Sequence, residues 1–363
     1  MSKIKIIESL GAKELSCMKG RALFQSLEYY DALIRSRSMS LRSGWKPYFF
    51  CVEDGGKTTA VLPVFERTQS SDEFIYDQCF VENFERRTKQ KYYPKASLCM
   101  PFVPIEGSKI ITDQDAYLNK EHIQIMEEWS KAQGHSSFHI ALPSHTEYDL
   151  LDFMGYISSD QSLGYWHNRN YVDFESFLLS LRSKYRAQIK KERLHIRFKG
   201  YQHFFLRGGE IQGRHIDMFF DLFEATHHRK GWKMSQLQRE FFHLLAQSRA
   251  KDMLLIFLTQ KNQTVAASCC FFHDDLLCGR FWGSTHDLDY VHFEVMYYLP
   301  IAYAIEHRVS KMEIGFMKVH KLIRGFESKS VRSYHRSLIP EVPLHYPEAL
   351  SESFGDKQIF LSI

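Results

Sequence analysis

The spacing of apolar and polar residues changes along the chain between period two and helical periodicity, which predicts a mixed α/β protein. In the first half, the two strand-like runs Trp45–Glu53 and Thr58–Arg67 flank Asp54-Gly55-Gly56, a favourable hairpin turn. The other elements predicted in this half are strands at Ile4–Ile7 and Ser137–Leu142 and helices at Asp113–Gln133 and His145–Phe153.

The second half repeats this mixed order. Its predicted helices are Phe174–Phe198, Gly213–His228, Ser235–Ser248 and Phe293–His307, and its predicted strands are Gln202–Leu206, Met253–Gln260, Thr264–Phe272, Leu276–Trp282, Lys311–Met317 and Arg332–Leu338. The sequence therefore predicts two α/β domains, residues 1–165 and 166–363, although no internal sequence repeat demonstrates a duplication.

Length and composition agree with two ordinary globular domains. The 363 residues include 44% hydrophobic and 15% aromatic residues, enough for sizeable cores, and the net charge of +4 does not by itself indicate a nucleic-acid partner. The seven cysteines show no CxxC spacing, so we expect reduced core thiols and no zinc site. The N-terminus has no signal-peptide core and the most apolar helix is too short to span a bilayer. We therefore expect a soluble, cytoplasmic protein.

Charged and imidazole side chains interrupt the apolar pattern between Gly279 and Phe326. Burying such groups is costly unless they are paired or used, so this segment is the main candidate site. His292 and Glu294 lie at the start of a predicted helix, with Tyr297 and Tyr298 on the same predicted face as Glu294. They suit removal of a proton from an attacking amine, and helix capping is the alternative.

Two further groups of residues in this segment each allow a functional and a structural interpretation. His320, Lys321 and Arg324 follow a strand end and suit binding of donor phosphates, against a solvated basic loop. Arg280 and Trp282 share one strand face, and Arg280 needs a partner, for which Glu294 is the natural candidate. A structural pair and a substrate-binding pair remain equally open.

The predicted helix that contains Lys190 and Lys191 has eight cations and one acid, Glu192, between Arg182 and Lys199. Such a local positive field fits a tRNA acceptor stem or anionic lipid head groups, and equally a solvated helix face. In the first half, Asp77 and Lys95, with Tyr92 and Tyr93, are candidate contacts to a sugar or peptide. No metal-binding, P-loop or GxSxG motif occurs.

The order of elements in the second half is similar to that of a GNAT acyltransferase domain. The residues resemble the FemAB-like group of GNAT-superfamily proteins labelled peptidoglycan biosynthesis or recognition proteins. The resemblance spans nearly the whole chain and rests on Gly44-Trp45-Lys46-Pro47, Leu62-Pro63-Val64-Phe65, residues 73–77, Tyr92-Tyr93-Pro94-Lys95, Pro101-Phe102-Val103-Pro104, residues 183–193, residues 279–283, His292-Phe293-Glu294, Tyr297-Tyr298 and residues 320–326.

The chain departs from the family pattern at two places. The stretch before the HKLxRGF-type motif, Ile314–Val319, is bulkier and lacks an acid, and the family's cysteine after HFE is Val295. The latter weighs against a cysteine nucleophile. The pyrophosphate loop of acetyl-coenzyme A enzymes is also absent from Lys318–Phe326, which favours an aminoacyl-tRNA or an unusual acyl donor.

The resemblance implies a tandem GNAT-like α/β fold with mixed, largely antiparallel sheets flanked by helices. It implies N-acyl transfer from acyl-coenzyme A or aminoacyl-tRNA, as co-substrate rather than tightly bound cofactor, to an amine of a cell-wall precursor, a peptide or a small molecule. We expect tRNA as a candidate partner and no DNA. The alternative is a non-catalytic module that recognises cell-wall precursors or a protein.

Overall fold

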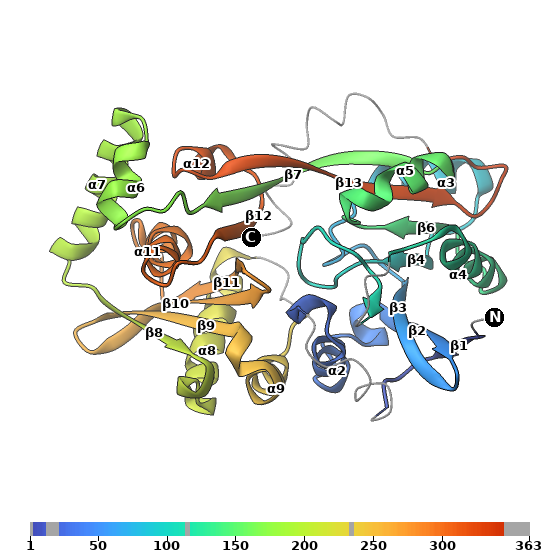
Figure 1. Cartoon of the computed structure of the whole chain (residues 1–363), viewed down its shortest axis with the longest axis horizontal. Coiled ribbons are helices and arrows are strands. Elements are labelled where there is room, and N and C mark those ends of the chain that lie inside the picture. Colours follow the sequence, from blue (N-terminus) through green and yellow to red (C-terminus); the bar gives the residue numbers. More distant parts are fainter. Residues whose placement is uncertain (1–2, 12–21, 113–116, 232–235, 345–363) are drawn as a thin grey trace. The chain divides into compact units, whose positions relative to one another are not determined.

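The computed structural model describes residues 3–11, 22–112, 117–231 and 236–344. Its contacts divide the chain into two units (Figure 1). Unit 1 comprises Met1–Ser162 and Ser330–Ile363, and unit 2 comprises Leu163–Lys329. The first boundary falls close to the predicted division between residues 165 and 166. The second has no counterpart in that prediction, because the chain returns to unit 1 after unit 2.

Unit 1 is built on a mixed sheet in the order β1-β2-β3-β4-β6-β13. Only β4 and β6 run parallel, while the other neighbouring pairs are antiparallel. The predicted hairpin is present, and Gly55 and Gly56 at its turn have positive φ values of 54° and 76°. The strands are β1 (Lys3–Ile7), β2 (Trp45–Asp54), β3 (Lys57–Arg67), β4 (Lys95–Leu98), β6 (Ser137–Ile140) and β13 (Glu327–Ser337), and β5 (Ile111–Thr112) pairs with β3.

The α-helices of unit 1 are α2 (Leu27–Arg35), α3 (Gln78–Thr88), α4 (Lys120–Ala132) and α5 (Tyr148–Phe153). Helix α4 begins at the N-cap Asn119, whose side chain accepts a hydrogen bond from the His122 amide. Its apolar residues Ile123 and Met126 join strand residues such as Phe50 and Phe138 in one core. The start of the predicted helix Asp113–Gln133 lies outside the described residues, as do Cys17 and Ser235.

Unit 2 has the strand order β7-β12-β11-β10-β9-β8, where β7 (Ile157–His167) contributes its residues from Leu163 onward. Strands β11 and β12 run parallel and the other neighbours antiparallel. Its strands are β8 (Gln202–Arg207), β9 (Met253–Gln260), β10 (Gln263–His273), β11 (Leu276–Ser284) and β12 (Lys311–Phe316).

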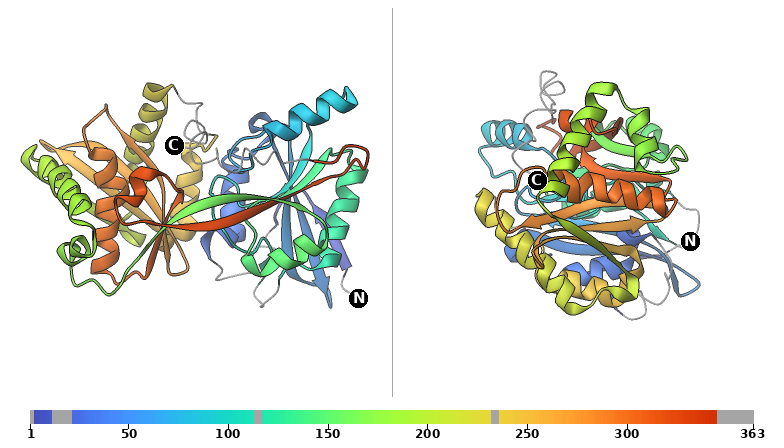
Figure 2. Two further views of the ribbon diagram at one scale, coloured as in Figure 1. Left: turned by 90° about the horizontal axis from the view of Figure 1, so that it is seen from above. Right: turned by 90° about the vertical axis from the view of Figure 1, so that its left-hand side faces the viewer.

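Helices cover both faces of this sheet, as Figure 2 shows, which is why β9 reads as a continuous apolar run. Leu254 and Ile256 of β9 pack in the core that includes helix α11, while Phe281 of β11 contacts Phe223 and Phe242 of α8 and α9. The helices are α6 (Phe174–Ser180), α7 (Ser183–Phe198), α8 (Gly213–Lys230), α9 (Arg239–Arg249), α10 (Val291–Phe293), α11 (Leu299–Glu306) and α12 (Val319–Leu322).

Two helix predictions in unit 2 need correction. The single helix Phe174–Phe198 is two helices, because Leu181 and Arg182 have extended ψ angles of 157° and 141°. Leu181 then packs against the core, where an extension of α6 would not place it. The helix predicted at Phe293–His307 starts at Val291 and contains a π-helical segment, η6 (Glu294–Tyr298).

Candidate functional site

Strands β11 and β12 pair only over their first residues. The parallel register runs from Leu276↔Lys311 to Cys278↔Glu313, yet β11 continues to Ser284 and β12 to Phe316. The two strands therefore part inside unit 2. Beyond the last pair, the β11 backbone has no hydrogen-bond ladder with β12, so a ligand could bond to its backbone groups on that side.

A buried ion pair stands at the point where the strands part. Arg280 donates to the carboxylate of Glu313, and both side chains are almost fully buried. The other carboxylate oxygen of Glu313 accepts from the Gly315 amide. The predicted pairing of Arg280 with Glu294 is therefore wrong. Sequence reasoning missed Glu313, although an acidic residue inside the apolar run Lys311–Met317 indicates a buried charge that needs a partner.

Lys321 lies across the end of β12. Its ammonium donates to the carbonyl oxygens of Ile314 and Phe316, both at 2.7 Å, and the residue is 8% exposed. Burial lowers the pKa of Lys321 to about 7, although the nearby carboxylate of Glu313 opposes this shift. Near neutral pH this lysine is therefore divided between its charged and neutral forms. Its contact with donor phosphate stays a prediction.

Arg324 is buried in a network rather than placed in an exposed loop. Its guanidinium donates to both carboxylate oxygens of Glu192 at 2.8 and 2.9 Å, and to the Tyr298 hydroxyl at 2.8 Å. The Phe293 ring lies 3.5 Å from its Cζ. Tyr298 also donates to Glu192. Such a nearly fully buried pair, in which Arg324 Nη2 bonds both oxygens of Glu192, fixes α7, η6 and the loop after α12 to one another.

Glu294 faces α7 and keeps one oxygen free. Its Oε1 accepts from Arg193 Nη2 at 3.1 Å, while Oε2 is buried and has no hydrogen-bond partner among the described residues. Burial raises the pKa of Glu294, and Arg193 opposes this effect. An unpaired buried carboxylate oxygen is costly, so it is a candidate proton acceptor.

His292 belongs to a second group with Trp282, Tyr297 and His320, in which Tyr297 is buried and the other three side chains are partly exposed. The His292 and Trp282 rings lie 4.5 Å apart, and Tyr297 Oη is 3.1 Å from His320 Nε2. Burial lowers the pKa of His292 to about 3 and that of His320 to about 4, with help from nearby cations including Lys321. Both imidazoles are therefore neutral near pH 7. The indole N–H of Trp282 is buried without a hydrogen-bond partner among the described residues.

The π-helical segment separates side chains that were predicted to share one face. Tyr298 lies with Glu192 and Arg324, whereas Tyr297 contacts His292 and His320. A π turn shifts the register of a helix by about one residue and often marks a functional site. The prediction that Glu294, Tyr297 and Tyr298 all share one face is therefore wrong, because the two tyrosines have different partners. Glu294 and His292 instead reach different partners from the same turn.

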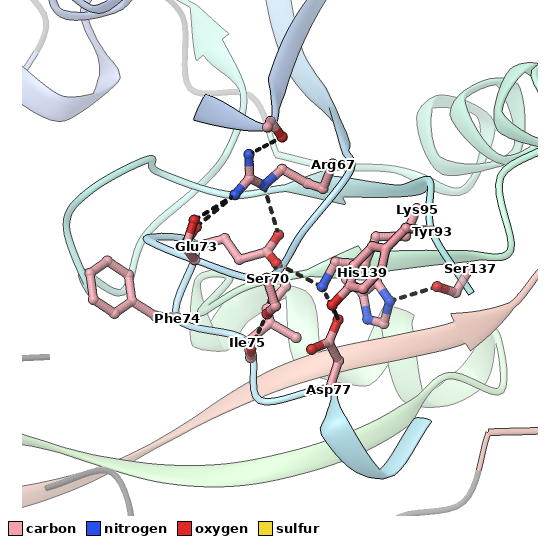
Figure 3. Close-up of polar contacts among 12 residues, drawn as sticks. Arg67, Ser70, Glu73, Phe74, Ile75, Asp77, Tyr93, Lys95, Ser137 and His139 are labelled. Atoms are coloured by element: carbon pink, nitrogen blue, oxygen red, sulfur yellow. Dashed lines mark hydrogen bonds and ion pairs between the residues drawn. The ribbon is translucent and has the colours of Figure 1, made fainter. Parts of the chain in front are cut away.

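Asp77 and Lys95 lie in unit 1, in the buried ionic cluster of Figure 3. Lys95 Nζ lies 2.5 Å from Asp77 Oδ2 and 2.7 Å from Glu73 Oε1, and Tyr93 donates to Asp77 at 3.1 Å. Arg67 pairs with Glu73 at 3.6 Å. Burial lowers the pKa of Lys95, but the two carboxylates outweigh it and raise the pKa above its ordinary value. The lysine therefore stays charged.

A neutral histidine pair adjoins this cluster. His139 and His335, on β6 and β13, face each other with their Nδ1 atoms 2.8 Å apart. His335 Nε2 also lies 2.8 Å from Ser159 Oγ, and His139 Nε2 lies 2.8 Å from Ser137 Oγ. Burial and the charge of Lys95 lower the pKa of both rings, that of His335 to about 3. Sequence reasoning did not single out these histidines.

The remaining predicted residues, Lys190 and Lys191, are exposed on α7, where Lys190 pairs with Glu175. Among the described residues, no three His, Cys, Asp or Glu side chains form a metal-binding group, and no helix is long and apolar enough to cross a membrane. In unit 2 the structure brings Trp282, Tyr297, His292 and His320 together and places Glu294 and Arg324 in ion pairs. The catalytic and binding roles of all these residues stay predictions.

Solved structures with the same fold cover nearly the whole chain. A conserved protein of unknown function from Bacteroides thetaiotaomicron VPI-5482 is 12% identical, with a TM-score of 0.55 over 92% of this chain and 99% of that one. FemX is 12% identical, with a TM-score of 0.52 over 90% and 96%. The C-terminal domain of a putative lysylphosphatidylglycerol synthetase from Agrobacterium fabrum is 7% identical, with a TM-score of 0.56 over 92% and 96%.

These likenesses confirm the predicted tandem GNAT-like fold with mixed, largely antiparallel sheets. No curated protein matches the sequence. The model of the FemAB-like family, described as peptidoglycan biosynthesis/recognition, matches residues 7–344. The chain therefore belongs to the FemAB-like family.

Proposed function

We propose that this protein is an N-acyltransferase that moves an acyl or aminoacyl group from a thioester or an aminoacyl ester to an amine. The observation that carries the proposal is the parting of β11 and β12 after Cys278↔Glu313, next to partly exposed, neutral aromatic and imidazole side chains. On the β11 side the ladder with β12 ends at Cys278, and backbone N–H groups of β11 that face away from β10 beyond this pair would suit the oxygen of a tetrahedral intermediate. Family membership supports the same reaction class.

The proposed reaction is direct transfer without an acyl-enzyme. The amine nitrogen attacks the carbonyl carbon, the new C–N bond forms, and the C–S or C–O bond of the donor breaks. The proton of the amine passes to a base, and the leaving thiolate or alkoxide is protonated. Glu294 Oε2 and the His292 imidazole are the two candidate bases. Because burial raises the pKa of Glu294 and lowers that of His292 to about 3, Glu294 is the better candidate for accepting a proton near neutral pH.

Separate substitution of the two bases tests the proposal. With a matching donor and amine, Glu294→Gln or His292→Gln should lower kcat by about 10²–10⁴-fold, the usual range for loss of a general base. Glutamine keeps an acceptor for Arg193, so Glu294→Gln should stay folded. Glu306→Gln, at an exposed site of the following helix α11, is the matched control and should leave kcat unchanged. Full activity in both base variants would contradict the assignment.

The donor and the acceptor are separate questions. Binding of acyl-coenzyme A and of charged tRNA, measured across a salt series, distinguishes the donors, because tRNA binding depends on counterion release and therefore falls steeply as salt rises. Mass spectrometry of ligands that copurify with the protein identifies acceptor candidates such as a cell-wall precursor, a peptide or a small amine. If the protein transfers an acyl or aminoacyl group to none of a panel of amines, the catalytic proposal is wrong.

The second candidate is a recognition module without catalysis. It is favoured by the internal pairing of the ionisable groups, since Arg280, Arg324 and Arg193 each have a carboxylate partner within unit 2. Such a module would bind a cell-wall precursor or a protein with equal affinity in wild type and Glu294→Gln. Binding of such a ligand without any consumption of an acyl donor would favour the recognition module over the acyltransferase.

A further inference from the structure

Helix α7 has an apolar stripe on its solvent face, in addition to the apolar face that it buries. Ile189 and Ile196 pack in the core of unit 2 together with the buried Glu192. On the opposite side, Leu194 is 64% exposed and Phe198 is 89% exposed. Leu194 and Phe198 lie one helical turn apart and so form a contiguous apolar patch, which distinguishes them from singly exposed apolar side chains.

Helical geometry gives the outer face a defined pattern. At about 100° per residue, Ala187, Leu194 and Phe198 fall within one narrow stripe opposite the buried residues. Lys190 and Arg197 fall on one side of the stripe, and Lys184 and Lys191 on the other. All seven of these residues are exposed. Cations therefore flank the apolar stripe on both sides.

The outer face of α7 is also free of acids. Glu192, the one acid of the helix, is turned inward to Arg324, and Arg193 is turned toward Glu294. The opposing charge that the structure shows nearby is Glu175 of α6, which pairs with Lys190. Arg197 lies close enough to Glu294 for its charge to lower the pKa of that carboxylate, so Lys184 and Lys191 are the flanking cations that remain to attract an anionic partner.

We propose that the outer face of α7 docks the protein on an anionic lipid surface, with Leu194 and Phe198 inserted at the head-group level. A cationic helix face with a central apolar stripe has the chemistry of an interfacial helix. Phosphate groups of lipids would pair with the flanking lysines, and the acyl boundary would take the two apolar side chains. A nucleic-acid backbone would use the cations but would leave Leu194 in water.

Vesicle cosedimentation of the full chain tests the proposal. The protein should bind vesicles of phosphatidylcholine mixed with phosphatidylglycerol, and bind phosphatidylcholine vesicles at least about tenfold more weakly. The double variant Leu194→Ser/Phe198→Ser should lose roughly tenfold or more in partition, because both apolar anchors are removed. Lys184→Glu/Lys191→Glu should lose roughly fivefold or more for each lysine.

Matched controls lie in unit 1. Phe153, 79% exposed, and Leu41, 69% exposed, provide Phe153→Ser/Leu41→Ser as the apolar control, and the exposed Lys57 provides Lys57→Glu as a charge control. Both should bind like wild type. Circular dichroism checks that each variant is folded, which the exposure of all these sites favours.

Three outcomes would overturn the proposal. These are absence of binding to the mixed vesicles, unchanged binding of Leu194→Ser/Phe198→Ser, and equal losses in the unit 1 controls. Binding of bulk tRNA in place of vesicles would assign the surface to nucleic acid and also overturn it. Because the assay does not use acyl transfer, its result is independent of the proposed reaction.

Discussion

Arg280 and Arg324, two deeply buried charges of unit 2, are each paired with a carboxylate, and this partner limits what each arginine can do. Arg324 is 1% exposed and Glu192 is 2% exposed, so the hydrogen bonds between them are shielded from water. Removing one member of such a pair leaves the other charge buried alone, which costs more than the pair itself contributes. These residues therefore position α7 and η6 as well as any ligand near them.

Arg324→Met is expected to lower the free energy of unfolding by about 3–5 kcal/mol, because Glu192 is left buried without a countercharge. The double variant Arg324→Met/Glu192→Met should be less destabilised than the sum of the single variants. Urea unfolding measures both. The exposed pair of Arg169 and Glu327, with exposed fractions of 65% and 52%, is the control, and Arg169→Met should change stability by less than about 1 kcal/mol. A small effect of Arg324→Met would contradict the structural importance of the network.

Lys321 predicts a pH dependence of stability. Its pKa is about 7 in the folded protein and near 10.5 in the unfolded chain, so between these values the unfolded state binds more protons. The contribution of Lys321 to stability therefore rises with pH above 7, by up to about 1.4 kcal/mol per pH unit. Denaturant unfolding at pH 7, 8 and 9 should show wild type gaining relative to Lys321→Met. Parallel pH profiles for the two proteins would mean that Lys321 is not titrating in this window.

At the scale of elements, strong periodicity was the reliable signal. Strands β2, β3, β9, β10, β11 and β12 lie where apolar runs predicted them, because apolar runs bounded by turn residues leave little alternative. Local interruptions within the predicted helices could not be predicted from the sequence. Nothing in the sequence around Leu181 resembles a helix stop, and the π turn at Glu294–Tyr298 depends on tertiary packing. The same holds for the candidate site. The sequence indicated candidate residues, but only the structure shows Glu313 and the partners of Arg280 and Glu294.

Gly283 controls how closely helix α8 approaches β11. A Cβ at this position would lie 2.1 Å from the backbone carbon of Leu222, so the helix would have to move. Gly283→Ala should therefore destabilise unit 2 by about 3 kcal/mol or more, as for severe overpacking. Gly209→Ala is the matched control, because nothing lies within 4 Å of the point that its added methyl group would occupy and its φ is ordinary. Thermal unfolding of both variants checks the prediction, and equal midpoints would exclude the close contact.

At the scale of the whole molecule, unit 1 is assembled from two separate parts of the chain. Strand β13 pairs with β6 from Tyr334↔Ile140 to Ser337↔Ser137, and Tyr334 is fully buried in the unit 1 core. Unit 2 is one continuous stretch, Leu163–Lys329. A division of the sequence at residue 165 alone would leave β6 with an unpaired edge and remove a core side chain.

Fragments of the chain test this interleaving. A fragment of residues 163–329 should unfold cooperatively in urea, because it contains every strand of unit 2. A fragment of residues 1–165 should lack a cooperative transition, since β13 is missing. Replacing residues 163–329 by a flexible Gly-Ser linker should restore cooperative unfolding to unit 1. Cooperative unfolding of the fragment 1–165 would show that β13 is dispensable and support the sequential division.

The interleaving also sets an order of events during synthesis on the ribosome. Strand β6 ends at Ile140, but its partner β13 is complete only when Ser337 has been added. At about 5–20 residues per second, this interval lasts on the order of 10–40 s. Unit 2 is continuous in sequence and can fold within that interval. During this time β6 in the first part of unit 1 lacks its partner β13, so one edge of the sheet is unpaired. Unit 1 thus begins to be made before unit 2 but finishes folding after it, so its first part is the natural client for a chaperone that shields nascent chains.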